Sequence, residues 1–320
     1  MTKAINELHT PVALDYALEM LGPALQGEDA VLVDGTLGLG GHTESFLERF
    51  PNLTVIGIDR DEQALALAAK RLERFGSRVI FAHAIYSEIL EVLEAEGLDQ
   101  VDAVLLDLGV SSMQLDEAER GFAYSFDVPL DMRMNQASGI TAAAVLNTYT
   151  EGELARIFKA YGEQRNAKQI AKAIVERRKV ENFANSADLA ALVSKYVPFI
   201  PGKSSGHPAK RVFQALRIEV NGELEILEET IPAAIEALRV GGRVLVMSYH
   251  SLEDGIVKQA LVKAATSLTP IEMPIELPEH APVIRILTKG TAVASEAEKQ
   301  ANPRAASVRM RVAEKIREAA

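Results

Sequence analysis

Four short apolar runs in the first third of the chain, each followed by a stretch of helical periodicity, constrain the fold more than any other feature. The runs are AVLVDGTLG from residue 30, LTVIGIDRD from 53, RVIFAHA from 78 and VDAVLLDLG from 101. Apolar runs that alternate with helices are typical of a parallel sheet that helices cover on both faces. We therefore expect an α/β domain with a parallel sheet.

The sheet pattern stops after Ser112 and resumes about a hundred residues later. Residues 113–215 contain three segments of helical periodicity and no strong strand signal. A long helix from about Arg217 to Leu238 then leads into a fifth run, GRVLVMSYH, and two β-rich runs, PVIRILTKG and SVRMRVAEK, predict a closing antiparallel pair.

This order predicts a class I S-adenosylmethionine-dependent methyltransferase fold, which is Rossmann-like with a mostly parallel seven-stranded sheet. We expect one domain made of residues 1–112 and 216–320. Residues 113–215 would form a helical insertion domain.

Composition limits both the chemistry and the partners. The 320-residue chain contains no cysteine, which excludes disulfides, thiolate metal sites and a cysteine nucleophile. The N-terminus has no unbroken apolar segment, so we expect neither a signal peptide nor a membrane anchor. We therefore expect a cytoplasmic protein. The net charge of −11 argues against a nucleic-acid partner, yet residues 141–217 hold 13 Lys and Arg against 6 Asp and Glu. This segment is a basic island of the kind that faces RNA.

Glycines gather where the first expected strand ends. The sequence DGTLGLGGH, residues 34–42, lets the backbone turn tightly and approach a ligand, although it departs from a GxGxxG fingerprint at Thr43. Asp59 ends the next strand, about 20 residues on, where an acidic side chain can accept both hydroxyls of a ribose. The alternatives are a plain tight turn and, for Asp59, Arg60 and Asp61, a solvated turn that caps the next helix.

Asp107 ends the fourth expected strand, at the edge where open α/β sheets bind ligands. An exocyclic amine is a poor nucleophile, and a carboxylate here can orient it and take its proton. Alternatively, Asp107 caps the following turn. After the fifth run, Tyr249 can stack on a base, and His250 can hydrogen-bond or titrate, or can be a buried, satisfied histidine. A hydrolase is disfavoured because no GxSxG elbow precedes a helix anywhere in the chain.

A basic helix start follows the insertion, at residues 207–217. It offers side chains suited to phosphate and base contact, namely Lys210, Arg211, Phe213 and Arg217. The alternative is a solvated amphipathic helix in which Phe213 lies in the core with Val212 and Leu216.

Blocks of sequence along nearly the whole chain share one resemblance. They are DGTLGLGGH, GIDRDEQAL, LLDLGVSSMQLDEAERGFAY, PLDMRM, YGEQRNAKQIAKAIVERR, HPAKRVFQALRIEVNGEL, SYHSLEDGIVK and NPRAASVR. Together they closely resemble the RsmH family, also called MraW, of bacterial 16S ribosomal RNA methyltransferases. The resemblance implies that S-adenosylmethionine is the cofactor and that the product is N4-methylcytidine in the decoding region of 16S ribosomal RNA. It also implies the small ribosomal subunit as partner, no metal, and neither membrane nor DNA binding.

The resemblance further implies a cofactor pocket and a catalytic group. The pocket residues are Gly40, Gly41 and His42 at the methionine part, Asp59 at the ribose, and Tyr86, Asp107 and Gln114 around the adenine and the methyl group. Asp107, Tyr249 and His250 are the catalytic candidates, and the helical insertion matches the family's substrate-recognition domain.

One family feature leaves a role to fill. Residues 107–110 read DLGV where related amino-methyltransferases carry Asp or Asn followed by ProProTyr, so the aromatic that stacks on the target base must come from elsewhere. Tyr249, Phe126 and Tyr124 are the candidates.

Two other functions fit parts of the pattern. The glycine loop and Asp59 favour a nicotinamide-dependent oxidoreductase, and the basic island suits a ribosome-assembly factor that binds RNA without catalysis.

Overall fold

The computed structural model describes residues 11–122, 127–197, 207–270, 273 and 277–318. The chain divides into two compact units, Met1–Gly109 with Leu224–Ala320, and Val110–Glu223. The insertion predicted at 113–215 falls within the second unit. None of the helices in the described ranges is both long and apolar enough to cross a membrane.

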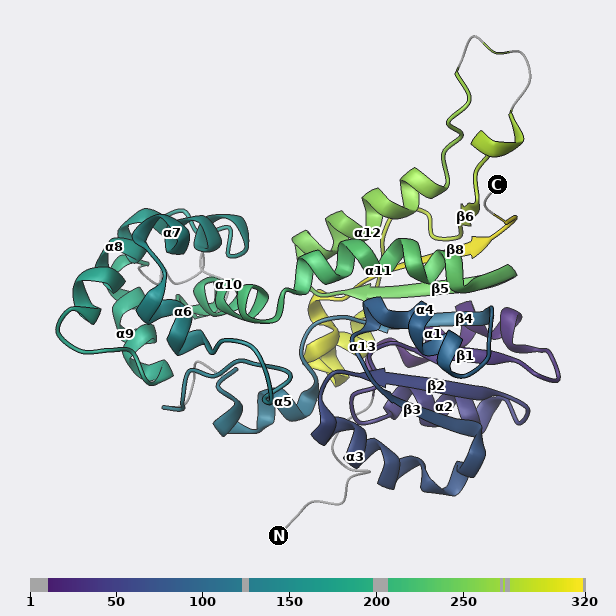
Figure 1. The fold of residues 1–320 in the computed structure, drawn as a ribbon, viewed down its shortest axis with the longest axis horizontal. Coiled ribbons are helices and arrows are strands. Elements are labelled where there is room, and N and C mark those ends of the chain that lie inside the picture. The colour runs from purple at the N-terminus through teal and green to yellow at the C-terminus, as the bar shows by residue number, and fades with distance from the viewer. Residues whose placement is uncertain (1–10, 123–126, 198–206, 271–272, 274–276, 319–320) are drawn as a thin grey trace. The chain divides into compact units, whose positions relative to one another are not determined.

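The first unit is built on one mostly parallel sheet (Figure 1). Within the described residues the strand order is β3-β2-β1-β4-β5-β8-β6, and β7 pairs with β8 off this path. The strands are β1 Val31–Asp34, β2 Thr54–Asp59, β3 Val79–His83, β4 Val101–Asp107, β5 Leu238–Ser248, β6 Ile284–Ile286, β7 Ala292–Val293 and β8 Arg309–Lys315. The first five strands pair in parallel, and β8 is antiparallel to β5, β6 and β7. The predicted α/β fold and its closing antiparallel pair are confirmed, and the two-residue β7 is an addition.

Helices cover both faces of this sheet, and the middle of β4, residues 103–106, shows why the strands are so apolar. Ala103 and Leu105 pack into a core with α1, α2 and α3, whereas Val104 and Leu106 pack into a second core with α4, α11 and α12. The helices are α1 Leu14–Leu21, α2 Gly41–Arg49, α3 Glu62–Leu72, α4 Ile89–Ala95, α11 Glu223–Ala237, α12 Ser251–Ala264 and the short α13 Glu296–Ala301. Alternate side chains of one strand thus enter different apolar cores, which is why residues 103–106 are all apolar.

Because β1, β2, β4 and β5 are parallel, their carboxyl ends meet at one edge of the sheet. Asp34, Asp59, Asp107 and Ser248 are the last residues of these four strands. The fold therefore gathers polar side chains that are far apart in the sequence.

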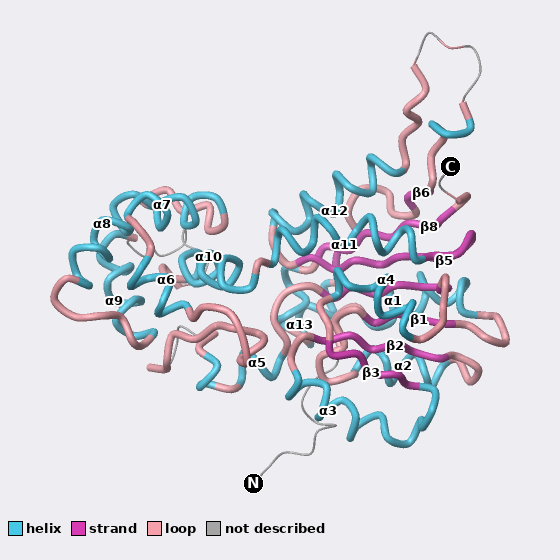
Figure 2. The backbone as a smooth tube through the Cα atoms, in the orientation of Figure 1, coloured by secondary structure: helices cyan, strands magenta, loops and turns pink. Residues whose placement is uncertain are grey.

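The second unit consists of helices and loops, as Figure 2 shows for its described part. Its helices are α5 Ser112–Asp116, α6 Ala142–Thr148, α7 Glu151–Ala160, α8 Ala167–Arg178, α9 Ser186–Tyr196 and α10 Lys210–Asn221. They enclose their own core, in which Phe158, Ile170 and Phe183 are at most 1% exposed. The three predicted helical segments of the insertion are confirmed as α7, α8 and α9.

The long helix predicted from about Arg217 to Leu238 is wrong. The structure contains two helices instead, because α10 ends at Asn221 and α11 begins at Glu223. Gly222 between them has a left-handed backbone (φ 60°), and its N–H donates to the carbonyl of Ile218. This is the helix-ending conformation that glycine adopts at least cost. Leu238 already belongs to β5.

Replacing Gly222 with alanine should destabilise the protein by about 1 kcal/mol, because a Cβ is disfavoured in the left-handed region. The matched control is Gly255→Ala in α12, where an added Cβ meets nothing within 4 Å. There alanine should stabilise the helix by up to ~1 kcal/mol. Urea unfolding of both full-length variants measures the difference, and a Gly222→Ala variant as stable as Gly255→Ala would contradict the assignment.

Candidate active site

The loop after β1 is shaped by glycine where it enters α2. Gly40 precedes the helix with a left-handed backbone (φ 74°). A Cβ at this position would lie 2.9 Å from the side chain of Leu72 in α3. The left-handed backbone therefore favours glycine at residue 40, and the contact with Leu72 shows that the loop lies close against α3. The predicted cofactor residues Gly40, Gly41 and His42 all belong to this connection.

Asp59, the last residue of β2, holds the backbone of the glycine loop by a hydrogen bond. One carboxylate oxygen accepts from the N–H of Gly38 at 2.8 Å, and the other accepts from the N–H of Asp61 at 2.9 Å. Burial raises the pKa of Asp59 to about 6, against a usual value of 3.8. Asp61, not Asp59, caps α3 by accepting from the N–H of Gln63. The alternative, in which residues 59–61 cap the next helix, is therefore correct for Asp61 and not for Asp59.

Asp107, the last residue of β4, is held by contacts from two other strand ends. Its Oδ1 accepts a hydrogen bond from the Tyr249 hydroxyl at 2.6 Å, and its own N–H donates to Thr36 Oγ1 at 2.7 Å. The next helix, α5, is capped by Ser111, whose hydroxyl accepts from the N–H of Gln114. Helix capping is therefore not the role of Asp107.

Carboxyl groups dominate the electrostatics of this edge. Burial raises the pKa of Asp107, while His42 and the Tyr249 hydroxyl act in the opposite direction. Burial and the nearby Asp107 carboxylate raise the pKa of Tyr249, so its phenol stays a hydrogen-bond donor. Asp34 and Glu253 act on Asp107 as further negative neighbours. The site favours a cation over an anion.

His42 faces Asp107 from the start of α2. Its Nε2 lies 2.9 Å from the carbonyl oxygen of Val12, and its Nδ1 lies 3.9 Å from Asp107 Oδ2. A carbonyl only accepts, so Nε2 carries the hydrogen in this contact and Nδ1 is directed at the carboxylate. His42 is thus oriented by the backbone just before α1.

Sequence reasoning did not select Asp34 and Thr36, which lie in the same glycine loop. Asp34 is 2% exposed, and its carboxylate accepts from the Thr43 hydroxyl at 2.7 Å. Burial raises its pKa as well. Thr36 anchors the backbone of Asp107. The sequence did carry a signal for Asp34, because it ends β1 in the same way as Asp59 ends β2 and Asp107 ends β4.

His250 forms the helix cap beside Tyr249. Its side chain accepts from the N–H of Glu253 at 3.3 Å, and the Glu253 carboxylate accepts from the N–H groups of Tyr249 and His250 at 2.7 and 3.2 Å. This reciprocal capping box begins α12 and fixes the turn that presents Tyr249. A catalytic role for His250 stays a prediction.

The other pocket residues are in different settings. Tyr86 begins the turn Tyr86–Glu88 after β3, and a Cβ on Gly35 would lie 3.3 Å from Tyr86 Cβ, so the tyrosine packs against the glycine loop. Gln114 belongs to the second unit, where its side chain accepts from the N–H of Ser111 at 3.1 Å. Tyr124 and Phe126 lie outside the described residues.

The predicted RNA-contacting residues all lie on α10, but they are not equally accessible. Lys210 and Arg211 are exposed. Arg217 donates two hydrogen bonds to Glu223, at 2.9 and 2.8 Å. Phe213 is 3% exposed and packs in the core of the second unit with its neighbours Val212 and Leu216. The predicted base contact by Phe213 is therefore wrong, because helical spacing turns this ring towards the core.

The strand order and the acidic carboxyl edge define a class I methyltransferase fold. The chain belongs to the MraW methylase family, whose model matches residues 6–316. It is 55% identical over 311 residues to "Ribosomal RNA small subunit methyltransferase H" of Nocardia farcinica, covering 96% of each chain. A protein of the same name from Saccharopolyspora erythraea is 54% identical over 314 residues, covering 98% of this chain and 95% of that one.

A solved structure, described as an rRNA methylase from Streptococcus thermophilus, is similar at a TM-score of 0.43 with 11% identity. The match covers 97% of this chain and 99% of that one.

Asp59→Asn should alter the pH dependence of stability. The native carboxyl group, with its pKa about 6, binds a proton that the unfolded group releases near its usual 3.8, so wild-type stability falls as the pH rises through 6. The neutral variant lacks this loss and should gain about 2 kcal/mol on wild type between pH 4.5 and pH 7.5. Urea unfolding at both values measures it. Any cost of the amide geometry is the same at both, so a constant difference would contradict the prediction.

Proposed function

We propose that this protein transfers a methyl group from S-adenosylmethionine to the exocyclic N4 amine of a cytidine in the decoding region of small-subunit ribosomal RNA. The observation that carries the proposal is Asp107, which stands at the carboxyl edge of the sheet with its Oδ1 fixed by the Tyr249 hydroxyl. The names of the similar proteins support an RNA acceptor. The N4 position and the decoding region rest on the family resemblance.

The charge of the site suits this cofactor. S-adenosylmethionine carries a positive sulfonium and a positive ammonium group, and three carboxyl groups end the strands here, the buried Asp34 and the partly buried Asp59 and Asp107. A nicotinamide dinucleotide would bring a negative pyrophosphate to the same carboxylates, and like charges repel at short range. The residues of the first unit that would hold the cofactor are Gly40, Gly41, His42, Asp59 and Tyr86. When bound, the cofactor supplies an activated methyl group.

The chain's own contribution to the transfer is orientation and proton removal. The base amine donates a hydrogen bond to Asp107, which turns its lone pair towards the methyl group. Asp107 takes the proton that the nitrogen loses as the new N–C bond forms. Tyr249 keeps the accepting carboxylate in place, and His42 on its other side stabilises the ionised form.

The second unit supplies the charge that RNA binding needs. Its segment 141–217 holds 13 Lys and Arg against 6 Asp and Glu, while the whole chain carries −11. Lys210 and Arg211 are exposed on α10 within this segment. Phosphate contacts by such side chains provide most of the sequence-independent affinity for RNA. The proposed substrate is assembled in the cytoplasm, so the proposal also places the protein there.

The proposal is tested by incubating the protein with radiolabelled S-adenosylmethionine and small ribosomal subunits that lack their own modification. Nucleoside analysis of the RNA should then show labelled N4-methylcytidine. Label on another nucleoside would refute the N4 assignment. Binding of subunits without any transfer would favour the assembly factor, and thermal stabilisation by NAD in place of S-adenosylhomocysteine would favour the oxidoreductase.

Asp107→Ala should reduce methyl transfer at least ~100-fold, because the variant loses its proton acceptor. Thermal stabilisation by S-adenosylhomocysteine should persist. The control is Asp102→Ala at the other end of β4, where a buried carboxylate accepts from the N–H of Val31 at 2.7 Å. This variant should lose stability and keep its turnover. Full activity of Asp107→Ala would refute the assignment.

Tyr249→Phe should move the acidic limb of the kcat profile to higher pH. The Tyr249 hydrogen bond lowers the pKa of Asp107, so its removal raises that pKa and leaves less carboxylate at a given pH. Tyr149→Phe is the matched control, because the Tyr149 hydroxyl likewise donates to a carboxylate, Glu219, at 2.9 Å. Its profile should match that of wild type. An unshifted Tyr249→Phe profile would show that this bond does not tune the base.

A further inference from the structure

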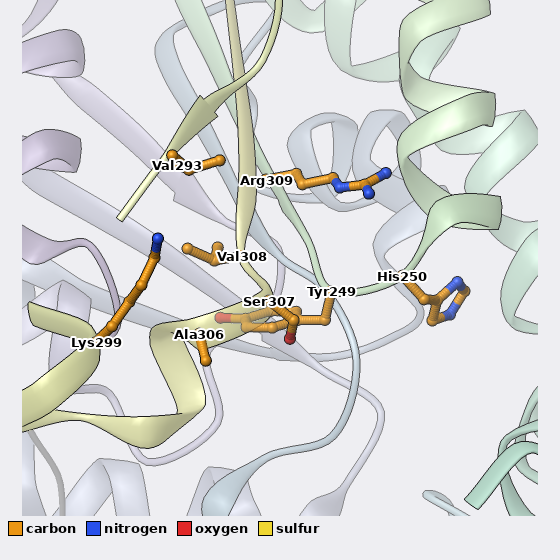
Figure 3. Close-up of a pocket in the computed structure, with 8 residues that line it drawn as sticks. All are labelled: Tyr249, His250, Val293, Lys299, Ala306, Ser307, Val308 and Arg309. Atoms are coloured by element: carbon orange, nitrogen blue, oxygen red, sulfur yellow. The ribbon is translucent and has the colours of Figure 1, made fainter. Parts of the chain in front are cut away.

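A cavity of about 210 Å³ lies in the first unit beside Tyr249, and the proposed transfer does not use it (Figure 3). Its walls come from the turn after β5, from β7, from α13, from the end of the turn Pro303–Ser307 and from the start of β8. The side chains that matter are Tyr249, Val293, Lys299, Ser307, Val308 and Arg309. The NPRAASVR block, which the proposed mechanism leaves without a role, forms much of this wall.

The lining combines an apolar surface with two cations. Val293 is 57% exposed although its side chain is apolar, and it borders the same cavity as the Tyr249 ring. Lys299 and Arg309 come from different elements, and their side chains are 26% and 46% exposed. An aromatic ring and an aliphatic wall suit the face of a base, and the two cations suit a phosphate. A nucleotide presents both kinds of group.

Arg309 is not needed to neutralise the acid beside it. Its guanidinium lies 3.4 Å from Asp254, but Arg311 already donates to both oxygens of that carboxylate, at 2.8 and 3.2 Å. Lys299 pairs with Glu296, which is 82% exposed, and an ion pair of this kind on a surface contributes little. Both cations can therefore turn to an incoming phosphate without leaving a buried charge unpaired.

Size and position limit the occupant. A cavity of about 210 Å³ is smaller than the 300–1,000 Å³ typical of sites for drug-sized ligands, so it suits one nucleotide better than a dinucleotide. Tyr249 borders the cavity, and its hydroxyl end binds Asp107. One side chain thus separates the cavity from the group that would accept the proton. A nucleotide held here is a close neighbour of the methylated one along the strand.

We infer that this cavity is a subsite for the nucleotide of single-stranded RNA that flanks the target base. Arg309 and Lys299 hold its phosphate, Ser307 offers a hydroxyl, and its base packs against Tyr249 and Val293. The inference rests on the proposed function, because it takes the strand in the subsite to be the one that is methylated.

The test measures binding of a fluorescent single-stranded RNA that contains the target cytidine, over a series of salt concentrations. Arg309→Gln should weaken binding roughly tenfold at low salt, because a charge-assisted hydrogen bond is lost. The slope of log affinity against log salt should also fall by about 0.7, the value for one phosphate contact on a single strand. Lys299→Gln should act in the same direction. Stabilisation by S-adenosylhomocysteine should not change.

Arg239→Gln is the matched control. Arg239 is 44% exposed and lies 3.2 Å from Asp102, so its exposure and pairing resemble those of Arg309. It stands at the start of β5, at the opposite end of the strand from Tyr249. This variant should keep wild-type affinity and slope. Inorganic phosphate should compete only weakly, because it lacks the base that packs on Tyr249.

The outcomes separate the subsite from the proposed function. Arg309→Gln with wild-type affinity and slope, or Arg239→Gln with an equal loss, overturns the subsite. Full competition by millimolar phosphate overturns the assignment of the cavity to a nucleotide and shows a site for anions in general. If wild type methylates the RNA while Arg309→Gln binds normally, the proposed function stands and the subsite fails. If binding depends on Arg309 but wild type transfers no methyl group, the RNA subsite stands and the methyl transfer fails.

Discussion

Burial of the parallel sheet on both faces is the constraint from which the rest of the first unit follows. Each central strand sends alternate side chains into two different apolar cores, so its middle positions are largely apolar. Polar chemistry is left to the strand ends, and parallel pairing brings these ends to one edge. Asp34, Asp59 and Asp107 are adjacent for this reason, although more than seventy residues separate the first from the last.

Gathering these carboxyl groups costs stability in the free protein. Burial raises the pKa of all three, which means that the fold disfavours their ionised forms. Hydrogen bonds from the Thr43 hydroxyl, the Gly38 N–H and the Tyr249 hydroxyl offset part of that cost. The same negative field stabilises a bound cation, so the free-energy cost of gathering the acids becomes affinity for a positively charged ligand. Tyr249 connects this acidic edge to the neighbouring cavity, because its hydroxyl donates to Asp107 and its side chain borders the cavity.

Local patterns predicted the elements well where one physical signal dominated. Short apolar runs predicted β1, β2, β3 and β4, and helical periodicity predicted α7, α8 and α9. The prediction failed where two signals coincided. Apolar spacing continues from α10 into α11, and only the left-handed backbone of Gly222 shows that the helix ends there. The position of Phe213 along α10 fits both an RNA-binding face and a face that packs inward. The structure shows that its ring packs in the core of the second unit.

The sequence by itself determined the fold class, the glycine loop and the acids that end the strands. Each of these depends on residue type and on spacing along a few neighbouring residues, which periodicity and steric limits express directly. Only the tertiary structure decided which distant groups meet. The hydroxyl of Tyr249 on Asp107, the Thr36 anchor beneath it, the orientation of His42 by Val12 and the cavity beside β8 all join residues from separate strands or helices. Such contacts follow from sheet order and packing, and no local stretch of sequence encodes them.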